Sequence, residues 1–382
     1  MQNFTYYVPT RIEFGTGKEQ QIGAMMAAQG VRKVLLCYGS ERIMHDGLFA
    51  TVSQSLAAEG IELVAFGGII SNPVISKVRE GIAVAREHQV DAILAVGGGS
   101  VLDSVKAMAA GVTYGGDVWD LFTGKGQFDS ALPVYAVMTL AATGSEMNAS
   151  AVVSNEDTHE KLFIGSVALY PKISVINPAL TRSVPRDYLV YSAADIIAHS
   201  IEAYFTASQH PNLQSRLVES VIKTVIETTE LLLANPQDDD ARGQFAWAAT
   251  LALNGITFAG AAGFSYPNHA IEHSLSALFN VPHGAGLSVV MPAWMKWYHS
   301  RNPQQFARFA DKIFGVQGAE AGIAALEAWF VKIGTPVRLS QLGIKESDFA
   351  AITANVRGNV TGFGIADIYT EAVIGEILHN AL

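Results

Sequence analysis

Residues 90–110 read VDAILAVGGGSVLDSVKAMAA, and this stretch decides the fold. Its first part, residues 90–96, is short and apolar, as expected for a strand of a parallel sheet that is covered on both faces. Four residues, Gly97-Gly98-Gly99-Ser100, follow this strand, and a helix is predicted to open at Val101-Leu102-Asp103. A strand that runs through a short loop into a helix is the repeating unit of α/β proteins.

The same rhythm runs through the first half of the chain. Further strands are predicted at residues 31–38, 61–66 and 133–138, with helices between them that run through Ala57 and to near His88. Beyond about Pro185 the strand signals vanish, and long helices are predicted at residues 188–207, 213–233, 241–260 and 306–314. The sequence therefore predicts an α/β domain at residues 1–185 and an all-α domain at residues 186–382.

Composition excludes several classes of protein. A chain of 382 residues is longer than one hydrophobic core usually accommodates, so we expect two domains. Hydrophobic residues make up 49% of the chain and charged residues 16%, a composition that argues against long disordered segments. A net charge of −10 and a pI near 5.5 argue against a nucleic-acid partner. The lone Cys37 excludes an intramolecular disulfide and a cysteine zinc site. The start MQNFTYYVPT lacks a signal pattern, so we expect a cytoplasmic location.

One apolar stretch, residues 245–264, is long enough to span a bilayer. It carries Thr250, Asn254 and several glycines, and it runs straight into a histidine cluster that needs water and a polar substrate. We therefore interpret it as a buried helix, and we expect no membrane partner.

Two polar loops follow predicted strands. The glycines at 97–99 would let the backbone approach a phosphate, and the helix N-terminus behind them adds partial positive charge. The run TLAATGSE, residues 139–146, places hydroxyls that can bind a ribose or carboxamide. Each loop by itself fits a tight or capped turn as well. Because ligands of open α/β sheets bind at the carboxyl ends of strands, two such loops together favour ligand binding.

Five side chains form a candidate metal site in the second half. Asp195 and His199 lie four residues apart in a helical pattern, His269 and His273 repeat that spacing, and His283 follows in a loop. Three imidazoles and one carboxylate suit iron(II) or zinc(II) and leave a position open to a substrate oxygen. Since five candidates compete for about four places, one of them should have another role. The other histidines are interpreted as having no site role.

Four motifs in this order resemble those of the iron-dependent, group III alcohol dehydrogenases. They are GGGS-x-x-D at residues 97–103, T-x-x-x-T-G-S-E at 139–146, the D-x-x-x-H helix, and H-x-x-x-H-x9-H-G at 269–284. The resemblance runs nearly end to end and is strongest to the butanol dehydrogenase and broad aldehyde reductase branch, as in GGGSVLDSVK and WAATLALNG. It implies a dehydroquinate synthase-like fold, with a Rossmann-like dinucleotide-binding domain and a helical metal-binding and substrate domain.

The resemblance also implies roles for individual residues. Asp195, His199, His269 and His283 would be the metal ligands, and His273 would be the catalytic group near the nicotinamide and substrate. The implied cofactor-binding residues are Asn72, Gly97, Gly98, Gly99, Ser100, Asp103, Thr139, Thr143, Ser145 and Lys161, the last of which would reach the cofactor ribose. We add Gly39 and Ser40, which follow the predicted strand at residues 31–38.

The cofactor preference rests on one departure from the family pattern. NAD-preferring relatives often place an acidic residue after the strand at residues 31–38, where it binds the ribose 2′-hydroxyl, whereas this chain has Gly39-Ser40. We therefore expect NADP(H) to be preferred, with NAD(H) possible. For the metal, the family convention is Fe2+, but the same ligands accept Zn2+.

The implied reaction is hydride transfer between NAD(P)H and small to medium aliphatic aldehydes or alcohols, with the carbonyl polarised by the metal. The alternatives are glycerol dehydrogenase-like polyol oxidation, another metal-dependent member of the superfold such as a dehydroquinate synthase-like lyase, and a nucleotide- and metal-binding protein without turnover. We expect a homodimer, in which an exposed strand at residues 10–14 could pair across the interface.

Overall fold

The computed structural model describes residues 1–382, which form two compact units. The sheet unit contains Tyr7–Thr158 and Leu162–Val184, and the helical unit contains Pro185–Leu382. Two short segments, Met1–Tyr6 and His159–Lys161, also belong to the helical unit. The sequence-based division at residues 185 and 186 did not anticipate these two segments.

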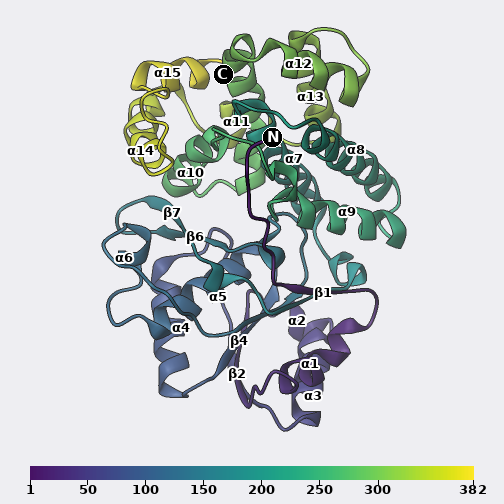
Figure 1. Ribbon diagram of the computed structural model, residues 1–382, viewed down its shortest axis with the longest axis vertical. Helices are drawn as coiled ribbons and strands as arrows, with labels where there is room; N and C mark the ends of the chain where they lie inside the picture. Colours follow the sequence, from purple (N-terminus) through teal and green to yellow (C-terminus); the bar gives the residue numbers. More distant parts are fainter. The chain divides into compact units, whose positions relative to one another are not determined.

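A six-stranded parallel sheet forms the centre of the sheet unit (Figure 1). The central strand β4 is buried along its whole length, which explains its unbroken apolar sequence. The edge strand β1 and the strand β8 beside it complete the sheet. In spatial order the strands are β1 (Arg11–Phe14), β8 (Ile173–Ile176), β5 (Val134–Met138), β4 (Ala92–Gly97), β2 (Lys33–Tyr38) and β3 (Glu62–Phe66).

The strand order reverses direction at β2, because β3 lies on one side of it and β4 on the other. Tyr38 at the end of β2 pairs with Val96, and Gly97 at the end of β4 pairs with Met138. The loops that follow β2, β4 and β5 therefore leave the same edge of the sheet side by side. Such a switch point is where open α/β sheets bind their ligands.

Helices and most of one hairpin complete the sheet unit, while the first two residues of β7 belong to the helical unit. Figure 1 shows α4 and α5 beside β4, and these two helices pack on each other. The strands β6 and β7 form a separate two-stranded sheet. The bounds are α1 (Ile22–Ala27), α2 (Arg42–His45), α3 (Leu48–Ala58), α4 (Ile75–Glu87), α5 (Gly99–Thr113), α6 (Trp119–Phe122), β6 (Ser150–Asn155) and β7 (Glu160–Gly165).

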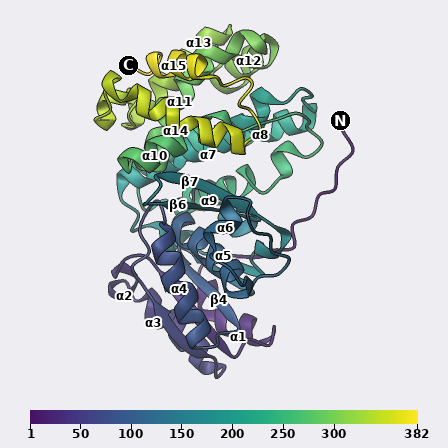
Figure 2. The ribbon, with the colours of Figure 1, turned by 90° about the vertical axis from the view of Figure 1, so that its left-hand side faces the viewer.

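The helical unit contains nine further α-helices. Figure 2 shows α14 beside α10, and these two helices pack on each other. No helix of the chain is long and apolar enough to cross a membrane. The bounds are α7 (Arg186–Thr206), α8 (Asn212–Ala234), α9 (Asp239–Ala252), α10 (Pro267–Phe279), α11 (His283–Tyr298), α12 (Pro303–Phe309), α13 (Ala319–Ile333), α14 (Phe349–Gly362) and α15 (Glu371–His379).

One expected helix, at residues 241–260, is wrong in its second half. It begins as expected, because Asp238 caps α9 by accepting a hydrogen bond from the Ala241 amide at 2.9 Å. It ends at Ala252, since Asn254 accepts a bond from the Ile256 amide and Gly255 has a φ of 97°. A left-handed glycine next to an asparagine turn interrupts the helix, so the apolar stretch is not one continuous segment.

Candidate active site

Three helices of the helical unit bring the predicted metal ligands together. Asp195 and His199 are buried on one face of α7, and His269 is buried in the first turns of α10. His283 is the first residue of α11, so its side chain extends from a helix end. The spacing of four residues predicted from the sequence therefore does place each helical pair on a shared face.

Two glycines explain how α11 reaches the other helices. A Cβ atom on Gly284 would lie 2.0 Å from the carbonyl oxygen of Tyr191 in α7. A Cβ atom on Gly286 would lie 2.7 Å from the side chain of Glu272 in α10. Because both positions lack a side chain, the start of α11 can approach α7 and α10 closely, and this approach delivers His283 to the cluster.

The donor atoms of the four residues converge on Asp195. Its Oδ1 atom lies 3.5 Å from Nε2 of His199 and 3.7 Å from Nε2 of both His269 and His283. The donor atoms of Asp195, His199 and His269 all lie within 4.8 Å of one another. Four donors about 2.1 Å from a tetrahedral ion would be about 3.4 Å apart, so these distances fit a single divalent ion.

Buried polar atoms without partners support the same conclusion. Asp195 Oδ1 and His269 Nε2 are fully buried and have no hydrogen-bond partner within the protein. An unsatisfied buried polar atom costs about 1–3 kcal/mol, so such atoms are rare without a functional reason. Both atoms point to the centre of the cluster, where a cation would satisfy them.

The electrostatics of the cluster hold Asp195 ionised. Burial by itself opposes ionisation of this carboxyl, but His199 and the two other histidines outweigh it and keep its pKa well below its ordinary value. Burial lowers the pKa of His199 to about 3 despite the nearby carboxylate. His269 is also buried, but it lies between Asp195 and Glu202, which raise its pKa to about 9.

Two glutamates that the sequence analysis missed contact the Nδ1 atoms of two histidines of the cluster. Glu202 Oε1 lies 2.9 Å from Nδ1 of His269, and Glu272 Oε2 contacts Nδ1 of His283. Both carboxylates have no exposed surface. Their spacing could have shown them, because Glu202 lies seven residues after Asp195 and Glu272 lies three residues after His269, on the same helix faces.

His273 lies beside the cluster. Its ring centroid is 6.3 Å from that of His269 and 5.8 Å from that of His283. Burial and the nearby Lys161 ammonium lower its pKa well below the ordinary value, so its imidazole is uncharged. One ring nitrogen bonds to the backbone of Lys161, while Nδ1 is buried without a partner.

A second group of potential ligands overlaps the first. Donor atoms of Glu272, His273 and His283 also lie within 4.8 Å of one another. However, the Lys161 ammonium lies 3.7 Å from Glu272 Oε2 and 3.4 Å from Nδ1 of His283. Since a cation already occupies this side of Glu272, the cluster centred on Asp195 is the better metal site.

The predicted cofactor residues lie mainly in the sheet unit. Gly39 and Ser40 follow β2, Asn72 follows β3, the glycine loop follows β4, and the threonine loop follows β5. Lys161 is the exception, because the structure places it in the helical unit beside Glu272 and His283. Its binding to the cofactor ribose stays a prediction.

The two polar loops of the sheet unit pack directly on each other. The Thr139 amide donates to the Gly97 carbonyl at 3.0 Å, and a Cβ atom on Gly99 would lie 2.6 Å from Thr143 Oγ1. Gly98 caps α5, so the first amides of this helix face the carboxyl edge of the sheet. The glycines are therefore required by the loop packing and also leave an anion-binding helix end open.

A buried lysine that the sequence analysis did not single out holds the threonine loop. Lys106 of α5 is fully buried, and its Nζ donates to Ser145 Oγ, the Asn148 carbonyl and the Ser150 carbonyl, each at 2.9 Å. Asp103 accepts a bond from Ser145 Oγ at 2.7 Å and one from the Val152 amide at 3.1 Å. Both charged groups thus have partners inside the protein.

Aromatic rings flank the metal cluster. Tyr266 lies 6.0 Å from His269, and Phe363, which follows α14, lies 6.1 Å from His273. Trp247 and Phe279, which lie nearby in the sequence, are 39% and 37% exposed. The ring next to His273 is therefore one that the sequence analysis did not name.

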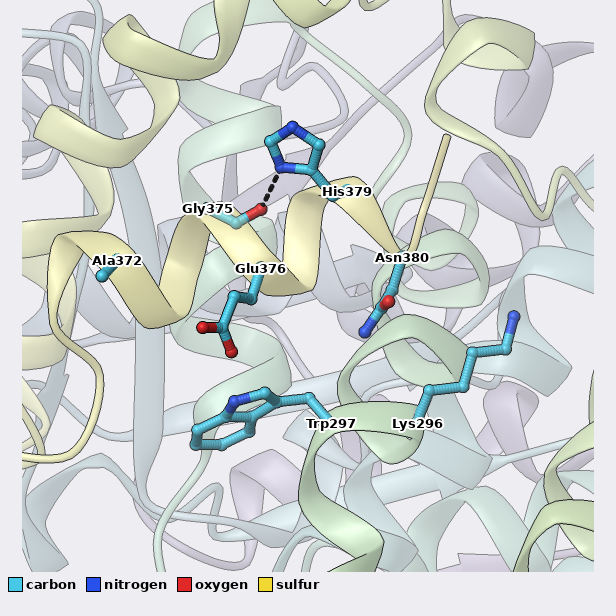
Figure 3. Close-up of a pocket in the computed structure, with 7 residues that line it drawn as sticks. All are labelled: Lys296, Trp297, Ala372, Gly375, Glu376, His379 and Asn380. Carbon is cyan, nitrogen blue, oxygen red and sulfur yellow. Dashed lines mark hydrogen bonds between the residues drawn. The ribbon is translucent and has the colours of Figure 1, made fainter.

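A surface cavity of about 640 Å³ lies elsewhere in the helical unit, between α11 and α15 (Figure 3). Three of its polar side chains are already paired: Lys296 binds Glu327, His379 Nδ1 contacts the Gly375 carbonyl, and Asn380 donates to the Ala293 carbonyl. Figure 3 shows Lys296 extending away from Glu376. The histidine cluster is therefore a better candidate for the active site than this cavity.

Comparison with protein families settles the classification. The model of iron-containing alcohol dehydrogenases matches residues 9–178, and that of the Fe-containing alcohol dehydrogenase family C-terminal domain matches residues 189–382. The chain belongs to the iron-containing alcohol dehydrogenase family. The resemblance inferred from the four motifs is thus confirmed, as is the predicted architecture of an α/β domain followed by a helical one.

Individual family members agree over nearly the whole chain. Probable NADH-dependent butanol dehydrogenase 1 of Bacillus subtilis is 38% identical, over 94% of this chain and 95% of its own length. NADPH-dependent aldehyde reductase YqhD of Escherichia coli is 32% identical, over 92% of each chain. The crystal structure of NADH-dependent butanol dehydrogenase A from Thermotoga maritima is 44% identical, with a TM-score of 0.96 over 100% of this chain and 99% of that one. This iron-containing alcohol dehydrogenase family member is therefore a metal-dependent NAD(P)-linked oxidoreductase.

Proposed function

We propose that the protein reduces small to medium aliphatic aldehydes to alcohols with NADP(H) as preferred cofactor, and that Asp195, His199, His269 and His283 hold one Fe2+ or Zn2+ ion. The observation that carries the metal assignment is the convergence of three Nε2 atoms on the unpartnered Asp195 Oδ1. When bound, the ion supplies a Lewis acid that polarises the aldehyde carbonyl for hydride transfer.

The residues around this site transfer a proton and exclude water. His273 is uncharged and bonds to the backbone of Lys161, which leaves Nδ1 free to accept the proton of an alcohol and to return it in the reverse direction. Tyr266 and Phe363 cover two of the histidines with aromatic surface. This surface favours apolar substrates and keeps water from the reacting atoms.

The surroundings of the cluster argue against an anionic substrate. Lys161 is a cation beside the ligands, but its charge is balanced by Glu272 at 3.7 Å. A lyase of the same superfold would need free basic groups for a carboxylate or phosphate. Polyol oxidation stays the alternative, because a second hydroxyl needs only a neutral hydrogen-bonding partner.

The NADP(H) preference rests on the loop after β2. Ser40 is exposed. Burial raises the pKa of Tyr38, and the Glu41 carboxylate, which is hydrogen-bonded to the Tyr38 hydroxyl, raises it further. Arg42 donates to the Ser183 carbonyl at 3.1 Å and keeps a buried Nε without a partner. A hydroxyl and a guanidinium in this loop suit the 2′-phosphate of NADP(H).

Butanal reduction tests the proposal. Purified protein is stripped of metal, reloaded with Fe2+ or Zn2+, and assayed with NADPH and NADH separately and with glycerol in the oxidative direction. Metal-dependent oxidation of NADPH well above NADH is the expected result. Turnover with NADH alone contradicts the cofactor preference, and turnover of glycerol with NAD+ but not of butanal favours polyol oxidation.

A loop variant sharpens the cofactor test. Arg42→Gln should raise the KM for NADPH by about tenfold, because losing about 1.4 kcal/mol of interaction with the 2′-phosphate corresponds to a factor of ten. The KM for NADH, which lacks this phosphate, should stay unchanged. Arg32→Gln, at the opposite end of β2, is the matched control. Equal KM changes for both cofactors in the Arg42 variant would contradict a contact with the 2′-phosphate.

We also propose a cytoplasmic homodimer that pairs through β1. This strand is the edge of the six-stranded sheet, and Phe14 at its end is 42% exposed. The free, buried thiol of Cys37 suits a reducing compartment. Light scattering after gel filtration should give twice the monomer mass, and Phe14→Lys should weaken the dimer.

A further inference from the structure

Glu272 is neither one of the four proposed metal ligands nor a proposed cofactor-binding residue. Its carboxylate is completely buried and contacts Nδ1 of His283 and the hydroxyl of Ser276. The Lys161 ammonium, also buried, lies 3.7 Å from Oε2. These groups form a connected cluster that reaches the proposed metal ligands through His283.

We propose that Glu272, with its charge balanced by Lys161, is a positioning residue that orients His283 toward the metal. The inference rests on the metal site proposed above. A neutral imidazole carries one proton, and a carboxylate at Nδ1 keeps the proton there and leaves Nε2 free as a ligand. The same hydrogen bond fixes the rotation of the ring, so that Nε2 faces Asp195.

His283 needs this support more than the other ligands do. Its side chain is 23% exposed, whereas those of His199 and His269 are 6% and 7% exposed. It also extends from the first residue of α11, where one side of the ring lacks the packing of a preceding helical turn. With less packing around it, the orientation of the ring depends on its hydrogen bond.

Glu202 provides an internal comparison. It binds Nδ1 of His269 at 2.9 Å in the same way, but its other partners are neutral: the His269 amide at 3.1 Å and the Asn268 side chain at 3.2 Å. Glu272 instead has a lysine. Replacing Glu272 by glutamine leaves the Lys161 charge uncompensated 3.4 Å from His283, where it repels a divalent ion.

This difference gives an ordered set of expectations. Glu272→Gln should weaken zinc binding by about 10- to 100-fold, which is the usual effect of replacing a residue that hydrogen-bonds a metal-bound histidine. Glu202→Gln should weaken it less. The double variant Glu272→Gln, Lys161→Met should bind zinc more tightly than Glu272→Gln alone, because the uncompensated charge is removed.

The experiment measures zinc and cobalt(II) binding to metal-stripped full-length protein without any nicotinamide cofactor. Zinc affinity comes from competition with a chromophoric chelator, and the visible spectrum of bound cobalt(II) reports the ligand geometry. Glu219→Gln is the matched control, since Glu219 is a buried carboxylate of the same unit that binds Arg308 and Tyr204 instead of a histidine. Circular dichroism checks that each variant is folded, and Glu272→Asp tests rescue by a shorter carboxylate.

The outcomes separate the inference from the proposed function. If the wild type binds neither zinc nor cobalt(II), the proposed metal site itself fails, and the inference fails with it. If the wild type binds both ions and Glu272→Gln matches it in affinity and spectrum, only the inference is overturned. If the double variant equals Glu272→Gln, the part assigned to Lys161 is overturned, and its predicted contact with the cofactor becomes the better account.

Discussion

The polar cluster around Lys106 in the sheet unit differs from the polar cluster around Asp195 in the helical unit in one respect. The Lys106 ammonium and the Asp103 carboxylate both have several partners within the protein. Asp195 Oδ1 and His269 Nε2 have none, although they are just as deeply buried. A cluster whose polar atoms are all paired holds a loop in shape, whereas buried polar atoms without partners favour a ligand-binding site.

The largest effect is expected at the unsaturated cluster. Asp195→Ala removes the carboxylate on which the three imidazoles converge, so the protein should lose its metal. Loss of Lewis-acid stabilisation of several kcal/mol lowers kcat/KM by about a thousandfold. Metal analysis of the purified variant and an aldehyde reduction assay measure both quantities. A fully metal-loaded Asp195→Ala protein would contradict the ligand assignment.

A smaller effect is expected at the edge of the same cluster. His273→Ala should lower kcat by about 100-fold, because a positioned proton-transfer group contributes about 10²–10⁴-fold. Metal content should stay at the wild-type level, since His273 is not among the four proposed ligands. Metal analysis and turnover measurements on the same preparation distinguish a proton-transfer role from a ligand role. Loss of metal would show that His273 is itself a ligand.

The saturated cluster should respond in stability instead of metal content. Lys106→Met leaves the carbonyl oxygens of Asn148 and Ser150 without their donor, and each orphaned buried group costs about 1–3 kcal/mol. The free energy of unfolding should fall by that order, and the KM for the cofactor should rise because the threonine loop loosens. Denaturant titration against the exposed-site control Lys125→Met measures the first effect. Unchanged stability would show that the loop is held by other contacts.

The smallest effect is a pH dependence of the same lysine. Burial lowers the pKa of Lys106 to about 8 in the folded protein, although Asp103 and Glu146 act in the opposite direction. Between about pH 8 and the ordinary lysine pKa, the unfolded chain binds more protons than the folded one, so stability from this group rises with pH. The unfolding free energy of wild type relative to Lys106→Met should increase by about 1 kcal/mol per pH unit in that window. A constant difference from pH 7 to pH 10 would show that Lys106 stays charged throughout.

Much of the fold could be read from local patterns. Short apolar strands, the glycine loop and the helical spacings are properties of neighbouring residues, and the strands at residues 31–38 and 90–96 lie within two residues of β2 and β4. The strand β8 was missed, because it has only four residues, three of them apolar, and these carry little pattern by themselves. The helix expected at residues 241–260 extended too far, since hydrophobicity outweighed the turn formed by Asn254 and Gly255.

The candidate site divides in the same way. The sequence by itself determined that Asp195 and His199 share a helix face, that His269 and His273 share another, and that a glycine loop ends a strand, because each depends on residues a few positions apart. Only the tertiary structure decided that α11 brings His283 to Asp195 and that Lys161 lies against Glu272. These pairs are 88 and 111 residues apart along the chain. Contacts over such separations follow from how whole helices pack, and no local spacing encodes them.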